Sequence, residues 1–101
     1  MNFAYIEFSS IRLFIANQEK DALMDNTILH LEDRGYDRDS VIEEMSIVNI
    51  GGDDRIYAVV VTFNDESDVD YFYTYEKGTN QIIQIDVGNR GSNESLKHQE
   101  S

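Results

Sequence analysis

The sequence contains no cysteine, no proline and no tryptophan among its 101 residues. The absence of cysteine excludes a disulfide framework, a thiolate zinc site and a cysteine nucleophile, but it leaves the cellular compartment open. Basic residues are scarce: eight Lys and Arg stand against twenty Asp and Glu, which gives a formal net charge of −12 at pH 7. A nucleic-acid binder needs a basic surface to neutralise phosphate, and adsorption to an anionic membrane has the same requirement. The charge balance therefore argues against both kinds of partner.

Long apolar runs are also absent, since no segment approaches the roughly 20 apolar residues that a membrane-spanning helix needs. The first eight residues lack the basic region of a signal peptide, and Glu7 and Arg12 interrupt any apolar region that would follow. We therefore expect membrane association only through an anchor that is not present in this sequence.

The first half of the chain has the periodicity of a helix. Apolar residues recur at three-, four- and seven-residue spacings across residues 11–34, which predicts one long helix. Residues 2–8 are expected to continue it on the N-terminal side. Gly35 stands where a left-handed C-terminal cap is needed, and Tyr36 is placed to fold back onto the last turn.

A second, short helix is predicted directly after this cap. Ser40 and Glu43 have the spacing of a capping box, in which the two side chains satisfy backbone N–H groups reciprocally. We therefore expect a helix over residues 41–45. After residue 45 the hydrophobic period changes from 3.6 to two, and a first strand is expected over residues 46–50.

Three further strands are predicted in the second half of the chain. Residues 55–64 are β-branched and aromatic on both faces, so this strand belongs in the interior of the sheet. Residues 69–76 alternate, and residues 81–87 close the sheet after a hairpin turn at residues 77–80. The short connections make neighbouring strands antiparallel. One face of the last strand is expected to carry Ile83, Ile85 and Val87.

Together these elements predict an α+β fold, with a long helix and a short helix packed on an antiparallel meander of three or four strands. A chain in which 41% of the residues are apolar has enough material for one hydrophobic core. We expect a single domain over residues 1–87. Residues 88–101 are polar and aperiodic, which predicts a disordered tail.

Catalytic and metal-binding patterns are not recognisable in the sequence. His30 in the long helix and His98 in the tail have no cysteine to complete a zinc site, so both are expected to be ordinary helix and tail residues. No serine lies in a nucleophile elbow. We therefore expect no catalytic residues, no metal, no cofactor and no enzymatic activity.

A cluster of acids follows the second predicted strand. Asp65, Glu66, Asp68 and Asp70 supply the oxygen ligands that calcium prefers, but they lack the spacing of a calcium-binding loop. The cluster is therefore expected to be a solvated acidic hairpin.

Tyr71, Tyr73 and Tyr75 share one face of the strand predicted over residues 69–76. They are either core residues beneath a helix, with their hydroxyls at the rim, or an exposed aromatic strip for a partner. Uncovered strand edges in a meander invite strand addition, and acidic turns favour a basic partner. The resulting hypothesis is a partner surface composed of Asp65, Glu66, Asp68, Asp70, Tyr71, Tyr73 and Tyr75.

Three segments carry a resemblance to a known family: LHLEDRGY at residues 29–36, YAVVVTFNDE at residues 57–66 and YFY at residues 71–73. Over residues 20–87 the chain resembles small, mostly Firmicute proteins of unknown function, named domain of unknown function number thirty-one thirty-nine. The resemblance implies an extracytoplasmic domain tethered by an N-terminal membrane segment, and it implies no catalytic residues. The sequence departs from the family pattern by lacking that segment and by having Ser67 where proline is expected.

We expect a non-enzymatic binding or interaction module, extracytoplasmic and tethered if the resemblance holds, and cytoplasmic otherwise. The alternative is a soluble acidic inhibitor, such as a phage or mobile element encodes, that occupies a basic surface of a host protein. The net charge of −12 would steer either one toward cationic surfaces. The expected partner is a protein, and a homodimer through a sheet edge is a further expectation.

Overall fold

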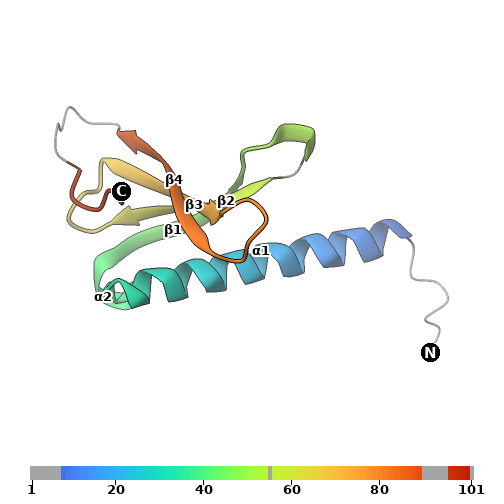
Figure 1. Cartoon of the computed structure of the whole chain (residues 1–101), viewed down its shortest axis with the longest axis horizontal. Coiled ribbons are helices and arrows are strands. Elements are labelled where there is room, and N and C mark those ends of the chain that lie inside the picture. Colours follow the sequence, from blue (N-terminus) through green and yellow to red (C-terminus); the bar gives the residue numbers. More distant parts are fainter. Residues whose placement is uncertain (1–7, 55, 90–95, 101) are drawn as a thin grey trace.

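A long helix followed by a four-stranded antiparallel sheet makes up the computed structural model, which describes residues 8–54, 56–89 and 96–100 (Figure 1). The strands lie in the order β1-β2-β3-β4, so each strand pairs with its neighbour in sequence. The predicted α+β fold with an antiparallel meander is therefore confirmed. The elements are α1 (Phe8–Asp33), α2 (Arg38–Val41), β1 (Ile42–Asn49), the 3-10 helix η2 (Gly52–Asp54), β2 (Tyr57–Phe63), β3 (Val69–Tyr75) and β4 (Ile82–Asn89).

The C-terminal half of α1 packs on the sheet through one stripe of side chains. Leu23, Thr27 and Leu31 are buried and recur every four residues, which places them on the same helix face. The hydroxyl of Thr27 donates a hydrogen bond to the carbonyl of Leu23 (2.7 Å), so burial leaves it satisfied. In Figure 1 the N-terminal part of α1 extends past the sheet. Helix begins at Phe8, and residues 2–7 of the predicted extension lie outside the described residues.

The helix ends in the cap that the sequence predicts. Gly35 has a φ of +92°, a conformation that glycine adopts without a steric penalty. Its N–H donates to the carbonyl of Glu32 (2.9 Å), and the N–H of Tyr36 donates to the carbonyl of Leu31 (3.0 Å). These two bonds form a Schellman motif. The ring of Tyr36 then lies 5.0 Å from that of Phe63, so the cap turns the chain onto the sheet.

The short helix lies earlier than predicted. Asp37 caps it by accepting a hydrogen bond from the N–H of Asp39 (3.1 Å), and the helix ends where the prediction has it begin. The helix predicted over residues 41–45 is wrong, because all but the first of these residues belong to β1. Ile42 and Met45 pair with β2 and pack against the core, so tertiary burial outweighs the local capping signal.

The core lies between α1 and one face of the sheet. All four strands contribute to this covered face, because the antiparallel registers bring their inward-pointing residues into line. The buried cluster consists of Leu23, Leu31, Val59, Val61, Phe63, Val69, Tyr71, Tyr73 and Ile82.

A β-bulge in β4 changes which side chains share a face. Tyr73 pairs with Gln84, whereas the preceding residue of β3 pairs with Asp86, so Ile85 is an extra residue in β4. Val87 consequently lies opposite Tyr71 and packs against the core. The prediction that Val87 shares a face with Ile83 and Ile85 is therefore wrong.

The tail expected to be disordered over residues 88–101 is ordered where the structure describes it. β4 continues to Asn89, and residues 96–100 lie on the covered face of the sheet. Leu96 packs against the core, and the ring of His98 stacks on that of Phe63 at 3.9 Å. Isolated apolar and aromatic side chains in a polar segment thus cover surface that α1 leaves exposed. The structure does not describe residues 90–95 and 101.

Candidate functional site

The tyrosines predicted as a partner surface lie largely in the core. Tyr71 and Tyr73 are 0% exposed, so the interpretation of the ladder as a binding strip is wrong for them and the core interpretation holds. Tyr75 is half-buried, and its hydroxyl accepts a hydrogen bond from Asn26 Nδ2 (2.8 Å). β3 lies between β2 and β4, so it cannot accept an added strand; in the sheet formed by the described residues, β1 and β4 are the edges.

The four predicted acids do not form one surface. Glu66 is 5% exposed, whereas Asp68 lies in solvent. Asp65 accepts a hydrogen bond from His98 Nε2 (2.7 Å) on the side of the sheet that the tail covers. Asp70 alternates with the buried tyrosines of β3 and therefore points to the opposite face.

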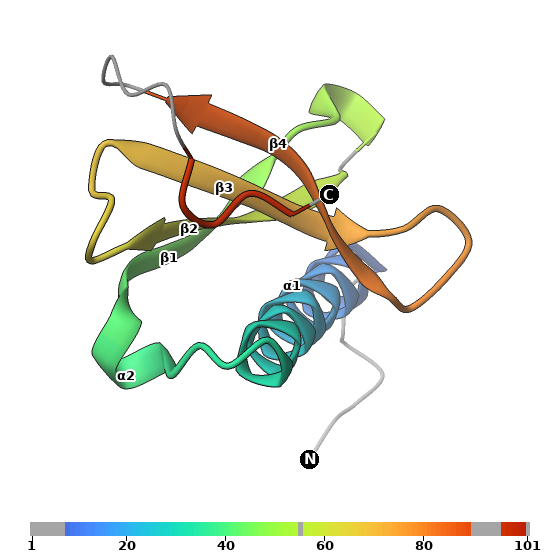
Figure 2. The same cartoon turned by 60° about the vertical axis from the view of Figure 1, so that its left-hand side comes forward.

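That opposite face carries no α-helix of the described chain (Figures 1 and 2). Its central row runs across all four strands, because the registers align Ser46, Val60, Phe72 and Asp86. Each of these four side chains is exposed or only half-buried. The row therefore places a valine and a phenylalanine in partial contact with solvent.

Two further rows flank the central one. On one side Val48 pairs with the buried Ala58, and Ile83, 38% exposed, pairs with Thr74. On the other side lies a polar row formed by Glu44, Thr62, Asp70 and Gly88. We define the open face by its exposed or half-buried apolar and acidic residues, which are Glu44, Val48, Val60, Asp70, Phe72, Ile83 and Asp86.

The ring of Phe72 packs against a glycine of the neighbouring strand rather than against a helix. A Cβ atom placed on Gly88 would lie 3.5 Å from Cε2 of Phe72, so the ring lies over the glycine backbone of β4. An aromatic ring over a strand glycine covers the backbone that a side chain would otherwise shield. Phe72 thus remains an ordered, half-exposed aromatic group at the centre of the open face.

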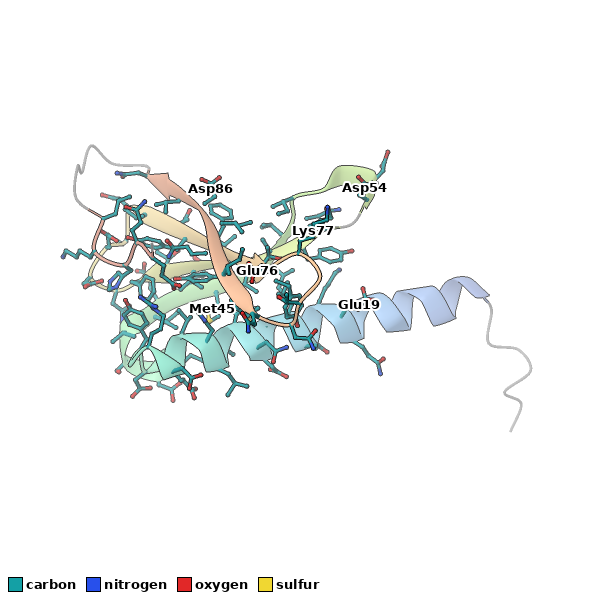
Figure 3. The ribbon with its side chains drawn as sticks, viewed as in Figure 1. Glu19, Met45, Asp54, Glu76, Lys77 and Asp86 are labelled. Atoms are coloured by element: carbon teal, nitrogen blue, oxygen red, sulfur yellow. The ribbon has the colours of Figure 1, made fainter. Side chains whose placement is uncertain are left out.

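The open face carries carboxyl groups in two of its three rows. Glu44 and Asp70 belong to the polar row, and Asp86 belongs to the central row. The hydroxyl of Thr62 donates to Asp70 Oδ1 (2.7 Å), which orients that carboxylate. Figure 3 shows Asp86 on the side of the sheet away from α1 and Met45 between the sheet and the helix.

A hollow of about 420 Å³ lies beside α1 and has a mainly apolar lining that includes Leu23, Tyr57 and Tyr75. Within residues 8–54, 56–89 and 96–100, no group of three or more His, Asp or Glu is placed to hold a metal ion. The same residues contain no helix that is long and apolar enough to cross a membrane.

A meander with helices on one side leaves room for an open second face, but the sequence-based hypothesis assigns the partner surface to acids and tyrosines of residues 65–75 instead. The segment over residues 55–64 is apolar on both faces, and a strand of this kind needs cover on both sides. Only one long helix is available in the sequence to supply that cover. Because two apolar faces need cover and one long helix is predicted, one face that includes Val60 is expected to stay uncovered.

Comparisons of the chain with protein-family models, with curated proteins and with solved structures found no match. The family resemblance of residues 20–87 accordingly stays a prediction from the sequence.

Proposed function

We propose that this protein is a non-enzymatic protein-binding module that contacts its partner through the open face. The observation that carries the proposal is the half-exposed pair of Val60 and Phe72 at the centre of a sheet face without a helix. Apolar patches rimmed by polar residues on soluble proteins mark interaction sites. Aromatic residues at the centre of such patches commonly supply most of the binding energy.

The chemistry of the open face defines the kind of partner. Glu44 and Asp86 place carboxyl groups beside the apolar centre, and the net charge of the whole chain is −12. A complementary surface would present apolar side chains flanked by lysine or arginine. Electrostatic attraction would accelerate its approach, most strongly at low salt.

A soluble acidic inhibitor is the alternative function, and the net charge of −12 favours it. Such an inhibitor would insert exposed acidic connections into a basic site, and Asp53 and Asp54 in η2 and Asp68 in the turn before β3 are exposed. The family resemblance favours the tethered, extracytoplasmic module, whereas the inhibitor implies a cytoplasmic protein. The two functions share a basic partner but place it on different residues.

A titration followed by NMR tests the proposal. The probe is a synthetic amphipathic helix of leucine and lysine, added to the 15N-labelled protein at low and at moderate salt. We expect amide shifts to change at Val48, Val60, Phe72 and Ile83. Shift changes centred instead on the acidic turns would favour the inhibitor.

Two charge-reversed double variants provide a matched comparison. Glu44→Lys/Asp86→Lys changes the open face, and Asp21→Lys/Asp25→Lys changes exposed positions of α1 by the same number of charges. We expect the first variant to weaken probe binding at least tenfold and the second to weaken it much less. Equal weakening in both variants would contradict the proposal, because it would indicate binding to net charge alone.

A further inference from the structure

The C-terminal segment, residues 96–100, is held by side chains of the body of the domain. It lies on the covered face next to β3 and β4 (Figure 2), and its Glu100 contacts His30 and Arg34 at the end of α1. It therefore occupies a site on the side of the sheet opposite to the open face. We call the body residues that contact it the tail site, which consists of His30, Arg34, Tyr36, Phe63, Asp65, Glu66, Tyr71 and Gln84.

Three side chains of the tail site bind the backbone of the segment. The amide of Gln84 donates to the carbonyl of His98 (3.0 Å) and accepts from the N–H of Glu100 (2.8 Å). Glu66 Oε2 accepts from the N–H of Lys97 (3.0 Å), and the hydroxyl of Tyr71 accepts from the N–H of His98 (3.1 Å). Contacts of this kind bind any extended peptide irrespective of its side chains.

These side chains are oriented by the core rather than by the segment. The hydroxyl of Tyr73 accepts a second hydrogen bond from Gln84 Nε2 (3.0 Å), which fixes the plane of the amide. The hydroxyl of Tyr71 donates to the buried carboxylate of Glu66. Burial raises the pKa of both tyrosines above the ordinary value of 10.0, so each hydroxyl keeps its proton well above neutral pH. The polar groups are thus preorganised for the segment.

The imidazole of His98 is recognised on its faces and at both nitrogens. Its ring stacks on Phe63 at 3.9 Å and meets Tyr36 and Tyr71 edge to face at 5.1 and 6.0 Å. Nε2 donates to Asp65 Oδ1 at 2.7 Å, and Nδ1 lies 2.9 Å from the hydroxyl of Tyr36. A phenylalanine or lysine at this position would leave one or both partners without a hydrogen bond.

The carboxylate of Glu100 is recognised by the end of α1. His30 Nε2 lies 3.0 and 3.1 Å from its two oxygens, and Arg34 Nε lies 3.4 Å from one of them. Basic groups at a helix C-terminus also compensate the negative end of the helix dipole. The tail site therefore recognises a histidine that is followed, two residues later, by an acidic side chain.

We propose that the tail site is a peptide-recognition site that the chain fills with its own C-terminal segment, and that an extended partner peptide with a His-x-Glu or His-x-Asp pattern displaces this segment. The proposal does not rest on the open face. A tethered segment competes at an effective concentration of about a millimolar or more. The apparent affinity for a free peptide is therefore lowered by the fraction of molecules in which the site is empty.

The test uses the 101-residue chain and a labelled peptide of residues 95–101, Ser-Leu-Lys-His-Gln-Glu-Ser, and follows binding by fluorescence anisotropy. His98→Ala weakens the tethered competitor without altering the body of the site. We expect this variant to bind the free peptide at least ten times more tightly than the wild-type chain. A peptide carrying the same His98→Ala change should bind at least ten times more weakly than the unchanged peptide.

A second substitution separates the site from nonspecific binding. Adding Gln84→Ala to the His98→Ala chain removes the two hydrogen bonds of Gln84 to the peptide backbone and should abolish the gain in peptide affinity. Adding Gln81→Ala instead, at an exposed position before β4, should preserve that gain. Two results would overturn the proposal. One is a folded His98→Ala chain that binds no peptide, which would make the segment a fixed part of the core. The other is a wild-type dimer that His98→Ala abolishes, which would make a second copy the occupant.

Discussion

The two faces of the sheet are formed by alternate residues of the same four strands, yet one face is buried and the other is partly exposed to solvent. On the covered face, α1 and residues 96–100 bury Val61, Tyr71 and Tyr73 completely. On the open face, Val60 and Phe72 stand at neighbouring positions and remain half-exposed. The strands themselves supply apolar side chains to both sides. The number of covering elements, rather than the composition of the strands, decides which side becomes the core.

This difference separates stability from recognition. Residues of the covered face are expected to determine the free energy of unfolding, because each is surrounded by packed neighbours. Substitutions on the open face are expected to lower the free energy of unfolding only slightly. The residues of this face are exposed enough to contact a partner. The predictions that follow compare matched positions on the two sides of this division.

The largest difference is expected between adjacent residues of β3. Tyr73→Ala removes a fully buried ring and should lower the free energy of unfolding by about 3–5 kcal/mol. Phe72→Ala removes a half-exposed ring and should lower it by about 1 kcal/mol. Urea unfolding followed by circular dichroism measures both values. Equal losses would mean that the open face is packed as tightly as the core.

A second comparison uses two leucines of α1 that lie two residues apart. Leu31 is 0% exposed and Leu29 is 57% exposed. Leu31→Ala should cost about 2–5 kcal/mol, whereas Leu29→Ala should change the stability by less than about 0.5 kcal/mol. The same urea titrations test this pair. A loss of more than about 1 kcal/mol for Leu29→Ala would show that α1 buries more than one stripe.

A third comparison uses two glycines. Gly35→Ala forces an alanine into a φ of +92° at the cap that turns the chain onto the covered face, and it should cost about 1 kcal/mol. Gly88→Ala adds a Cβ at ordinary contact distance from Phe72 on the open face, so its effect should stay within about 0.5 kcal/mol. Thermal melts of the two variants rank them. The reverse order would contradict the assignment of the cap.

The smallest expected effect is a change in the pH dependence of stability at acidic pH. The hydrogen bond from His98 lowers the pKa of the Asp65 carboxyl below its ordinary value of 3.8. A lowered pKa in the folded state stabilises the protein above the ordinary value, and this contribution is lost as the pH falls through the lowered one. The wild type should therefore be more stable than Asp65→Asn at about pH 6, and the two should converge near pH 2.

The control for this pH series is Asp68→Asn, which changes an exposed carboxylate in the same turn. Its difference from the wild type should stay small across the series. A difference for Asp65→Asn that does not change between about pH 6 and pH 2 would show that His98 does not favour the charged carboxylate.

The elements with local signals could be predicted from the sequence. The cap at Gly35 follows from the end of the helical period, and the position of β2 in the sheet interior follows from its apolar character on both faces. Alternation also places Tyr71 and Tyr73 on one face of β3, but it leaves open whether that face is core or partner surface, and the structure shows that it is core. In each case the residues that carry the signal lie next to one another in the chain.

The features that depend on distant contacts could not be predicted. The capping box at residues 40–43 is locally sound, but pairing with β2 draws Ile42 and Met45 into a strand. The bulge at Ile85 reverses the faces of β4 without any change in composition. The docking of His98 depends on the rings of Tyr36, Phe63 and Tyr71 and on the carboxylate of Asp65, none of which is close to the tail in the sequence.

Hydroxyl-radical footprinting of the free and the probe-bound protein tests most directly whether one face is core and the other a contact surface. Residue-resolved oxidation rates are compared for Phe72, Tyr71 and Tyr73, without and with a saturating amount of the leucine–lysine helix. The account predicts that Phe72 is oxidised in the free protein and protected in the complex, while both tyrosines are protected throughout. Protection of Phe72 equal to that of Tyr73 in the free protein, or oxidation of Phe72 unchanged by the probe, would contradict it.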